Sequence, residues 1–281
     1  MKTGLVLEGG AMRGMFTAGV TDVFMENEIA FDGLIGVSAG ALFGCNYKSG
    51  QIGRTIRYNK KYCNNPEYCS FRSLLKTGNL FGTDFCYRKI PEELDVFDYK
   101  SYNNNPMEFY IVCTDVETGK PVYKKCNKME ENTLEWYRAS ASLPLAAEIV
   151  EVDGYKLLDG GISDSIPLKY FEDIGYTKNV VITTQPASYR KKKNKALPLI
   201  KIALKKYPEA IKAVQKRHIM YNSTLSYIAD REHSGAAYVI RPETDLGIKH
   251  VEHNPDNLER VYQLGRQAGE KHLENIRNFL K

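Results

Sequence analysis

A serine between two glycines is the first feature of this chain that could do chemistry. Residues 36–40 read GVSAG, after a short apolar run and before a helix-like run. This order predicts a strand, a tight turn and a helix, with Ser38 at the apex. Gly36 and Gly40 would leave room for a strained serine backbone, as in the nucleophile elbow of acyl-transfer enzymes. The helix after Ser38 would direct its first N–H groups toward a forming oxyanion.

A second glycine-rich segment near the N-terminus offers a place for that oxyanion. Residues 8–14 read EGGAMRG and lie between an apolar run at 3–7 and an amphipathic helical pattern. A strand, a glycine loop and a helix present free N–H groups to an anion. A dinucleotide fingerprint is not met, because Ala11 replaces the middle glycine and Asp32 precedes its strand instead of ending it. A P-loop is not met either, since no Gly-Lys-Ser or Gly-Lys-Thr follows.

A carboxylate beside two glycines forms the third segment. Asp159 ends a predicted hairpin at 152–158, which has an Asp-Gly turn, and Gly160 and Gly161 follow directly. Glycines at these positions would let another element approach closely and leave the carboxylate uncrowded. Taken alone, the pattern equally fits an ordinary turn at the end of a strand.

The elements that must position these residues alternate between strand and helix signals. Buried strands are predicted at 109–114, 180–184 and 237–240, and a long amphipathic helix at 258–280. The alternation predicts an α/β fold of three layers, with a mostly parallel central sheet flanked by helices. Residues 54–106 are rich in tyrosine and asparagine, and we expect them to form helices and loops that roof the serine.

Together, the three segments resemble the patatin-like phospholipase family, in particular its bacterial members. The family's oxyanion loop, serine elbow and aspartate segment correspond here to residues 9–14, 36–40 and 159–161. The small-residue stretch at 138–144 and the segment 165–167 are also similar to the family. The order and spacing of these segments are more specific than any one of them.

The resemblance implies a patatin-like fold and a Ser-Asp dyad without histidine, metal or cofactor. Ser38 would attack a lipid ester, and Asp159 would accept its proton, return it to the leaving alcohol and later activate water. Burial would raise the pKa of Asp159 and make it a better base. The oxyanion loop would consist of Gly9, Gly10, Ala11, Met12, Arg13 and Gly14. Within it, the N–H groups of Gly10 and Ala11, with Met12, would hold the oxyanion, and Arg13 would brace the loop.

The resemblance covers residues 3–185, which we predict to be the catalytic domain. Residues 186–281 are predicted to form a mostly helical extension packed on it. Ala11 departs from the family, which usually has a third loop glycine there. At a positive φ an alanine would cost about 1 kcal/mol, whereas a position that needs only a free N–H would tolerate it.

The composition is ordinary for a folded protein and is compatible with an enzyme of this kind. The 281 residues are 43% hydrophobic and 26% charged, and no stretch approaches the length of a membrane span. No secretory signal follows Met1, and the six cysteines form no zinc-binding pattern. We therefore expect a cytoplasmic protein with free thiols.

Positive charge is concentrated between residues 189 and 217. That segment has eleven basic residues and one acidic residue, a net charge of +10, while the whole chain carries +5. An apolar stripe runs through it at helical spacing, and Pro208 would kink or divide the helix. Such a helix suits peripheral contact with an anionic membrane at its inner face, but equally a core-packed helix with a solvated lysine face. No nucleic-acid partner is expected, because no recognised binding motif is present and the remaining chain is acidic.

Two further functions stay open. One is an α/β-hydrolase with a Ser-Asp-His triad, although that fold places its serine after several strands and not after the second. Its candidate bases are His218, His233, His250, His253 and His272. The other is a non-catalytic lipid- or nucleotide-binding module. The sequence does not specify the head group, the chain length or the ester bond that is cleaved, nor hydrolysis over acyl transfer.

Overall fold

The computed structural model describes residues 1–130 and 132–281, and these contain one eight-stranded sheet. Five strands are mutually parallel: β1 (Lys2–Leu7), β2 (Gly33–Val37), β3 (Glu108–Asp115), β7 (Tyr176–Ile182) and β8 (Ala237–Ile240). Three are antiparallel to their neighbours: β4 (Pro121–Lys125), β5 (Val150–Val152) and β6 (Tyr155–Asp159). The strand order is β5-β6-β3-β2-β1-β7-β8, with β4 paired to β3. The predicted buried strands and the hairpin before Asp159 are confirmed.

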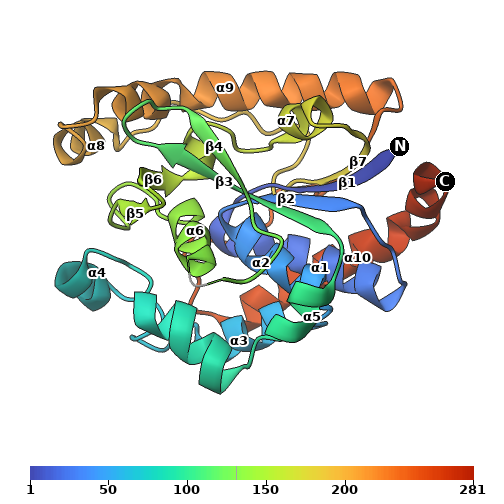
Figure 1. Ribbon diagram of the computed structural model, residues 1–281, viewed down its shortest axis with the longest axis horizontal. Helices are drawn as coiled ribbons and strands as arrows, with labels where there is room; N and C mark the ends of the chain where they lie inside the picture. Colours follow the sequence, from blue (N-terminus) through green and yellow to red (C-terminus); the bar gives the residue numbers. More distant parts are fainter. Residues whose placement is uncertain (131) are drawn as a thin grey trace.

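Helices cover both faces of the sheet (Figure 1). One layer contains α1 (Gly14–Glu26), α2 (Ala39–Ser49), α3 (Arg54–Tyr62), α5 (Tyr99–Asn104), α6 (Thr133–Ser140) and α10 (Pro255–Leu280). The other contains α7 (Leu168–Asp173), α8 (Leu197–Ala203) and α9 (Pro208–His233). The short helix α4 (Phe71–Thr77) and a π-helix at Phe85–Leu94 lie near one end of the sheet. The expected three-layer α/β architecture is therefore correct.

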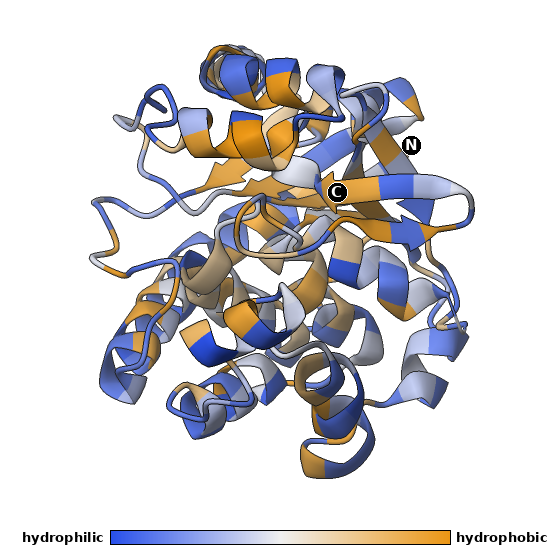
Figure 2. Cartoon of the chain, turned by 90° about the vertical axis from the view of Figure 1, so that its left-hand side faces the viewer, coloured by the Kyte–Doolittle hydropathy of each residue, from blue (hydrophilic) through white to orange (hydrophobic). Residues whose placement is uncertain are grey.

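The sheet is apolar on both faces, as a parallel sheet between two helical layers must be. Leu5 and Leu7 belong to the core beneath α1 and α2, whereas Val6, between them, belongs to the core beneath α7 and α9. This alternation follows from the two-residue period of a strand. Figure 2 shows the hydrophobic strands enclosed between helices whose hydrophilic residues face outward.

Strand β3 is longer than its neighbour β2, and this difference places the third motif beside the first. Along one edge of β3, the pairing with β2 ends at Val112, opposite Val37. The pairing with antiparallel β6 then begins at Cys113, opposite Asp159. Because β4 occupies the other edge of β3, β2 and β6 meet end to end on the same edge. Ser38, the residue after Val37, and Asp159 therefore come together.

The C-terminal segment, residues 186–281, contributes to both helical layers and to the sheet. It contributes β8 beside β7, and its last helix, α10, packs closely on α1. Gly265 makes this approach possible, since a Cβ atom there would lie 2.0 Å from the carbonyl oxygen of Phe16. The division of the chain near residue 185 stays a prediction.

Pro208 divides the basic segment into α8 and α9, one of the two outcomes expected for it. The apolar stripe faces the protein, where Ile200, Leu204 and Val214 pack in a core with Leu158 and Ile162. The stripe is therefore used for folding, while the lysines of these helices face solvent. None of the described helices combines the length and hydrophobicity needed to cross a bilayer.

Candidate active site

Ser38 lies in a strained turn between β2 and α2. Its backbone has φ 54° and ψ −122°, a region that is costly for a residue with a side chain. The flanking glycines make the turn sterically possible. A Cβ atom at Gly36 would lie 2.6 Å from the nitrogen of Ala41, and one at Gly40 would lie 2.5 Å from the carbonyl oxygen of Leu7. The strand, turn and helix predicted around Ser38 are present.

Ser140, at the end of α6, braces this turn. Its hydroxyl accepts the backbone N–H of Ser38 at 2.8 Å and donates to the carbonyl of Val112 at 2.7 Å. Ser140 is fully buried, so both contacts are shielded from water. The sequence of residues 138–144 resembles the family but carries no local signature of this bracing contact.

The glycine loop packs directly against Ser38. A Cβ atom at Gly9 would lie 3.0 Å from the Cβ atom of Ser38. A short 3-10 turn at Ala11–Arg13 follows, and its first hydrogen bond runs from the N–H of Arg13 to the carbonyl of Gly10 at 3.2 Å. The N–H groups of Gly10, Ala11 and Met12 come before that bond, so the turn itself gives them no partner. These are the three N–H groups of the loop that the turn leaves without a partner.

Ala11 has φ 49°, in the left-handed region that favours glycine. The departure from the family's third glycine therefore carries a backbone cost of about 1 kcal/mol. Gly14, the last loop residue, begins α1 and lets Phe43 pack against the helix start, because a Cβ atom there would lie 2.7 Å from that ring.

Asp159 is buried at the end of β6, with 2% of its surface exposed. Its carboxylate accepts the N–H of Gly161 at 2.7 Å. A Cβ atom at Gly160 would lie 2.2 Å from the carbonyl oxygen of Val112, so this glycine allows β6 to meet β3. The Ser38 hydroxyl also favours the ionised form of this carboxylate.

The pKa of Asp159 is raised, and burial is the cause. Four influences oppose the rise, in order of size: Arg217, the Ser38 hydroxyl, the Gly161 N–H and Lys191. A raised pKa makes the ionised carboxylate a stronger base, which is a property of a general base.

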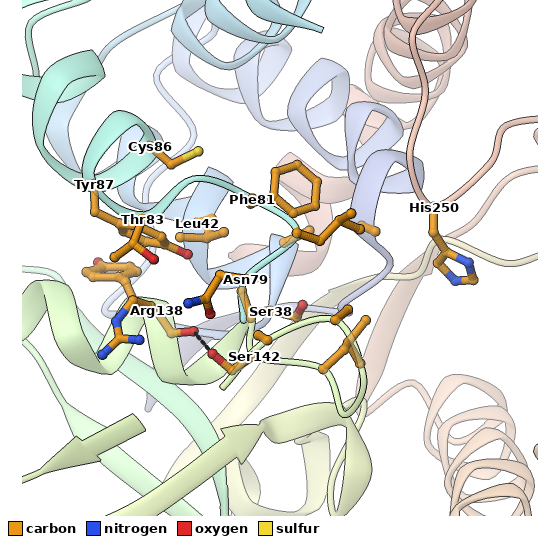
Figure 3. Close-up of a pocket in the computed structure, with 18 of the residues that line it drawn as sticks. Ser38, Leu42, Asn79, Phe81, Thr83, Cys86, Tyr87, Arg138, Ser142 and His250 are labelled. Carbon is orange, nitrogen blue, oxygen red and sulfur yellow. Dashed lines mark hydrogen bonds between the residues drawn. The ribbon is translucent and has the colours of Figure 1, made fainter. Parts of the chain in front are cut away.

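A cavity of about 450 Å³ opens beside Ser38 and is lined mostly by apolar side chains. Figure 3 shows Ser38 among the lining residues, with Leu42 and Tyr87 to one side and His250 on the other. The predicted helices and loops of residues 54–106 supply much of the lining, including Tyr58, Phe81 and Ile90. A cavity of this size and character suits an acyl chain.

A family model described as patatin-like phospholipase matches residues 5–172. The chain belongs to the patatin-like phospholipase family. A second model, described as a domain of unknown function (DUF6363), matches residues 207–281, which hold α9, β8 and α10.

Two relatives and one solved structure are similar to this family member. It is 34% identical over 197 residues to the uncharacterized protein YjjU of Escherichia coli (strain K12), covering 65% of this chain and 52% of that protein. It is 25% identical over 184 residues to the neuropathy target esterase sws of Drosophila melanogaster, covering 64% of this chain and 12% of that protein. The structure of VipD from Legionella pneumophila aligns with a TM-score of 0.47 at 12% identity, covering 98% of this chain and 67% of that chain. The chain thus spans about half of the first relative's length and much less of the second's.

Within residues 1–130 and 132–281, no histidine is hydrogen-bonded to Ser38 or Asp159. His250 lies nearest the cavity, and its Nε2 is 3.2 Å from Arg13 Nη1. His253 contacts the carbonyl of Cys63, and His272 contacts the hydroxyl of Tyr238. The described residues therefore hold no Ser-Asp-His geometry.

Glu8, directly before the loop, ties the site to the C-terminal segment. Its buried carboxylate accepts from the hydroxyl of Tyr221 on α9 and from the N–H of Thr184, each at 2.5 Å. Burial raises the pKa of Glu8, and these donors oppose the rise. The sequence gives no signal for this contact, because 213 residues separate Glu8 from Tyr221 and no local pattern links them.

Proposed function

We propose that this family member is a serine acyl hydrolase that cleaves carboxyl esters of lipids, of the phospholipase A or lysophospholipase type. The observation that carries the proposal is the register of β3, whose pairing passes from β2 to β6 between Val112 and Cys113. That register brings a strained serine and a buried aspartate together beside an apolar cavity. Family membership supports a lipid ester as the substrate.

In the proposed reaction, Ser38 Oγ attacks the ester carbonyl carbon while Asp159 takes the hydroxyl proton. The carbonyl oxygen becomes an oxyanion held by the N–H groups of Gly10, Ala11 and Met12, with that of Ala39 as a further donor. Collapse of the intermediate releases the alcohol, which receives the proton from Asp159, and leaves an acyl-serine.

Water then attacks the acyl-serine, with Asp159 again accepting a proton and passing it back to Ser38. The carboxylate must be ionised to act as a base. Burial raises the pKa of Asp159. We therefore expect the rate to fall on acidification with a midpoint above about 3.9, the pKa of an ordinary aspartate.

Substitution of Ser38 tests the proposal. A fluorophosphonate probe should label the wild type once, and Ser38→Ala should lose both the label and hydrolysis of p-nitrophenyl butyrate. Ser101→Ala, at an exposed position of α5, is the control and should keep both. A Ser38→Ala protein that is folded and still labelled would place the nucleophile elsewhere.

We also propose that the enzyme is cytoplasmic and touches the anionic inner face of the membrane through residues 189–217. Six free cysteines fit a reducing compartment. Lys201, Lys205 and Lys206 are exposed on one end of the molecule, next to Leu199 and Ile202, which are 60% and 70% exposed. Cations and exposed apolar side chains together favour an anionic lipid surface.

Vesicle binding tests this contact. The triple variant Lys201→Gln, Lys205→Gln, Lys206→Gln should bind vesicles rich in anionic lipid at least about tenfold more weakly at low salt, at about 1 kcal/mol per charge. A triple variant with the same loss of charge away from this end of the molecule should bind like the wild type: Lys61→Gln, Lys100→Gln, Lys281→Gln. Equal binding by all three proteins would contradict the contact.

A further inference from the structure

A second cavity adjoins the first at the C-terminal segment. Its volume is about 520 Å³, and Asn194, Val214 and Arg217 line both cavities. The first cavity is mainly apolar, whereas the second carries the side chains of Lys191 and Lys192. No described residue that lines the second cavity is an aspartate or glutamate.

Two of its cations are held in place by other groups. The backbone of Lys191 is fixed by Asn222, which accepts its N–H at 2.8 Å and donates to its carbonyl at 3.0 Å. The Lys191 ammonium lies 4.5 Å from the centre of the Tyr221 ring. Arg217 donates from Nε to the carbonyl of Gly161 at 2.5 Å. Because these two cations are already held in position, binding an anion costs less conformational entropy.

Neither cation forms a salt bridge within the described part of the chain, although the buried Asp159 carboxylate interacts with both over a longer distance. Among residues 1–130 and 132–281, no carboxylate lies within 4 Å of a side-chain nitrogen of Lys191 or Arg217. Glu8, a carboxylate that does act on Lys191, already accepts from Tyr221 and Thr184. Partial burial and the nearby Arg217 lower the pKa of Lys191 to about 8, so it remains mostly charged at neutral pH.

The cations lie next to the place where the leaving alcohol would depart. A Cβ atom at Gly161 would be 2.9 Å from a carboxylate oxygen of Asp159 and 3.0 Å from Nη2 of Arg217. In the proposed reaction Asp159 hands its proton to the leaving alcohol. With the acyl chain in the apolar cavity, that alcohol is directed toward Arg217 and Lys191.

We propose that the second cavity binds an anionic head group, a phosphate monoester on the leaving alcohol, through Arg217 and Lys191. This inference rests on the proposed hydrolase function and narrows its substrate class. A phosphate accepts several charge-assisted hydrogen bonds from such donors. A zwitterionic head group would bring an ammonium for which the described lining offers no carboxylate. Esters with net negative head groups are therefore preferred over zwitterionic or neutral ones.

Three soluble esters with the same acyl chain test this preference. They are 1-octanoyl-glycerol phosphate, 1-octanoyl-glycerophosphocholine and 1-octanoyl-glycerol, all used as monomers so that no lipid surface is involved. The wild type should show the highest kcat/KM for the phosphate ester. Lys191→Gln should lower the ratio of kcat/KM for the phosphate ester over the neutral ester about tenfold or more, the effect of losing one hydrogen bond between charged groups.

Two variants control for charge and folding. Lys191→Arg keeps the charge and should keep most of the preference. Lys120→Gln removes one charge from an exposed turn outside both cavities and should leave the ratio at its wild-type value. If Lys191→Gln behaves like Lys120→Gln, or if the wild type shows no preference, the head-group site is wrong while the hydrolase stands.

Binding gives a readout that does not depend on turnover. Ser38→Ala protein titrated with 1-octanoyl-glycerol phosphate should bind it more tightly than 1-octanoyl-glycerol, and adding Lys191→Gln should remove the difference. Tighter phosphate binding without hydrolysis of any ester by the wild type would overturn the proposed function and support the head-group site. Equal binding of both compounds would overturn the site.

Discussion

Residues 5–172 hold Ser38 and Asp159 through backbone geometry, whereas the C-terminal segment reaches the same site with long side chains. In the first region, glycines at 36, 40 and 160 let backbones approach to distances that a Cβ atom would forbid. In the second, Tyr221 and Arg217 extend from α9 to Glu8 and to the carbonyl of Gly161. In the proposed reaction, the first region would position the reacting groups, and the second would set the charge around them.

The two kinds of contact respond differently to substitution. Close backbone approach tolerates few residue types, so it leaves a pattern of glycines at fixed spacing. A long side chain that spans two segments can come from many sequence positions and leaves no such pattern. We therefore expect the C-terminal contacts to be the ones that a conservative substitution can remove singly.

Tyr221→Phe should have the larger effect on stability, because it deletes a donor to a buried carboxylate. Leaving Glu8 with one fewer donor should lower the free energy of unfolding by about 1–3 kcal/mol, measured by urea denaturation. The pKa of Glu8 should also rise further, since the Tyr221 hydroxyl opposes the effect of burial.

Tyr189→Phe is the matched control, because the Tyr189 ring packs edge-on against Tyr221 at 5.9 Å. Its hydroxyl has no hydrogen-bond partner among the described residues. This variant should change the unfolding free energy by less than about 0.5 kcal/mol. Equal losses in the two variants would mean that the link between α9 and the loop contributes nothing specific.

Ala11→Gly should have the smaller effect and the opposite sign. Glycine relieves the left-handed backbone at φ 49°, but it also gains freedom in the unfolded chain. The balance should raise the unfolding free energy by up to about 1 kcal/mol. Ala213→Gly, inside helix α9, should instead lower it by about 1 kcal/mol. A loss of stability in Ala11→Gly would contradict the strain inferred for Ala11 in the loop.

The same contrast explains what the sequence could predict. The turn at Ser38, the hairpin before Asp159 and the alternation of strands and helices each have a local signature, and the structure contains them. Three other features have no local signature. They are the hydrogen bond from Ser38 to Ser140, the hydrogen bond from Tyr221 to Glu8, and the side toward which the apolar stripe of the basic helices faces. Whether a stripe of apolar residues faces a core or a membrane depends on the tertiary neighbours, here Leu158 and Ile162.

The most direct test of the central claim is the turnover of Asp159→Asn. The claim is that Ser38 and Asp159 hydrolyse the ester without a histidine. Asp159→Asn should lower kcat for p-nitrophenyl butyrate by at least about 10²-fold while remaining folded, the usual scale for a general base. Single substitution of each of the five histidines should leave kcat within a few-fold. A folded Asp159→Asn with near wild-type turnover, together with collapse in one folded histidine variant, would contradict the dyad.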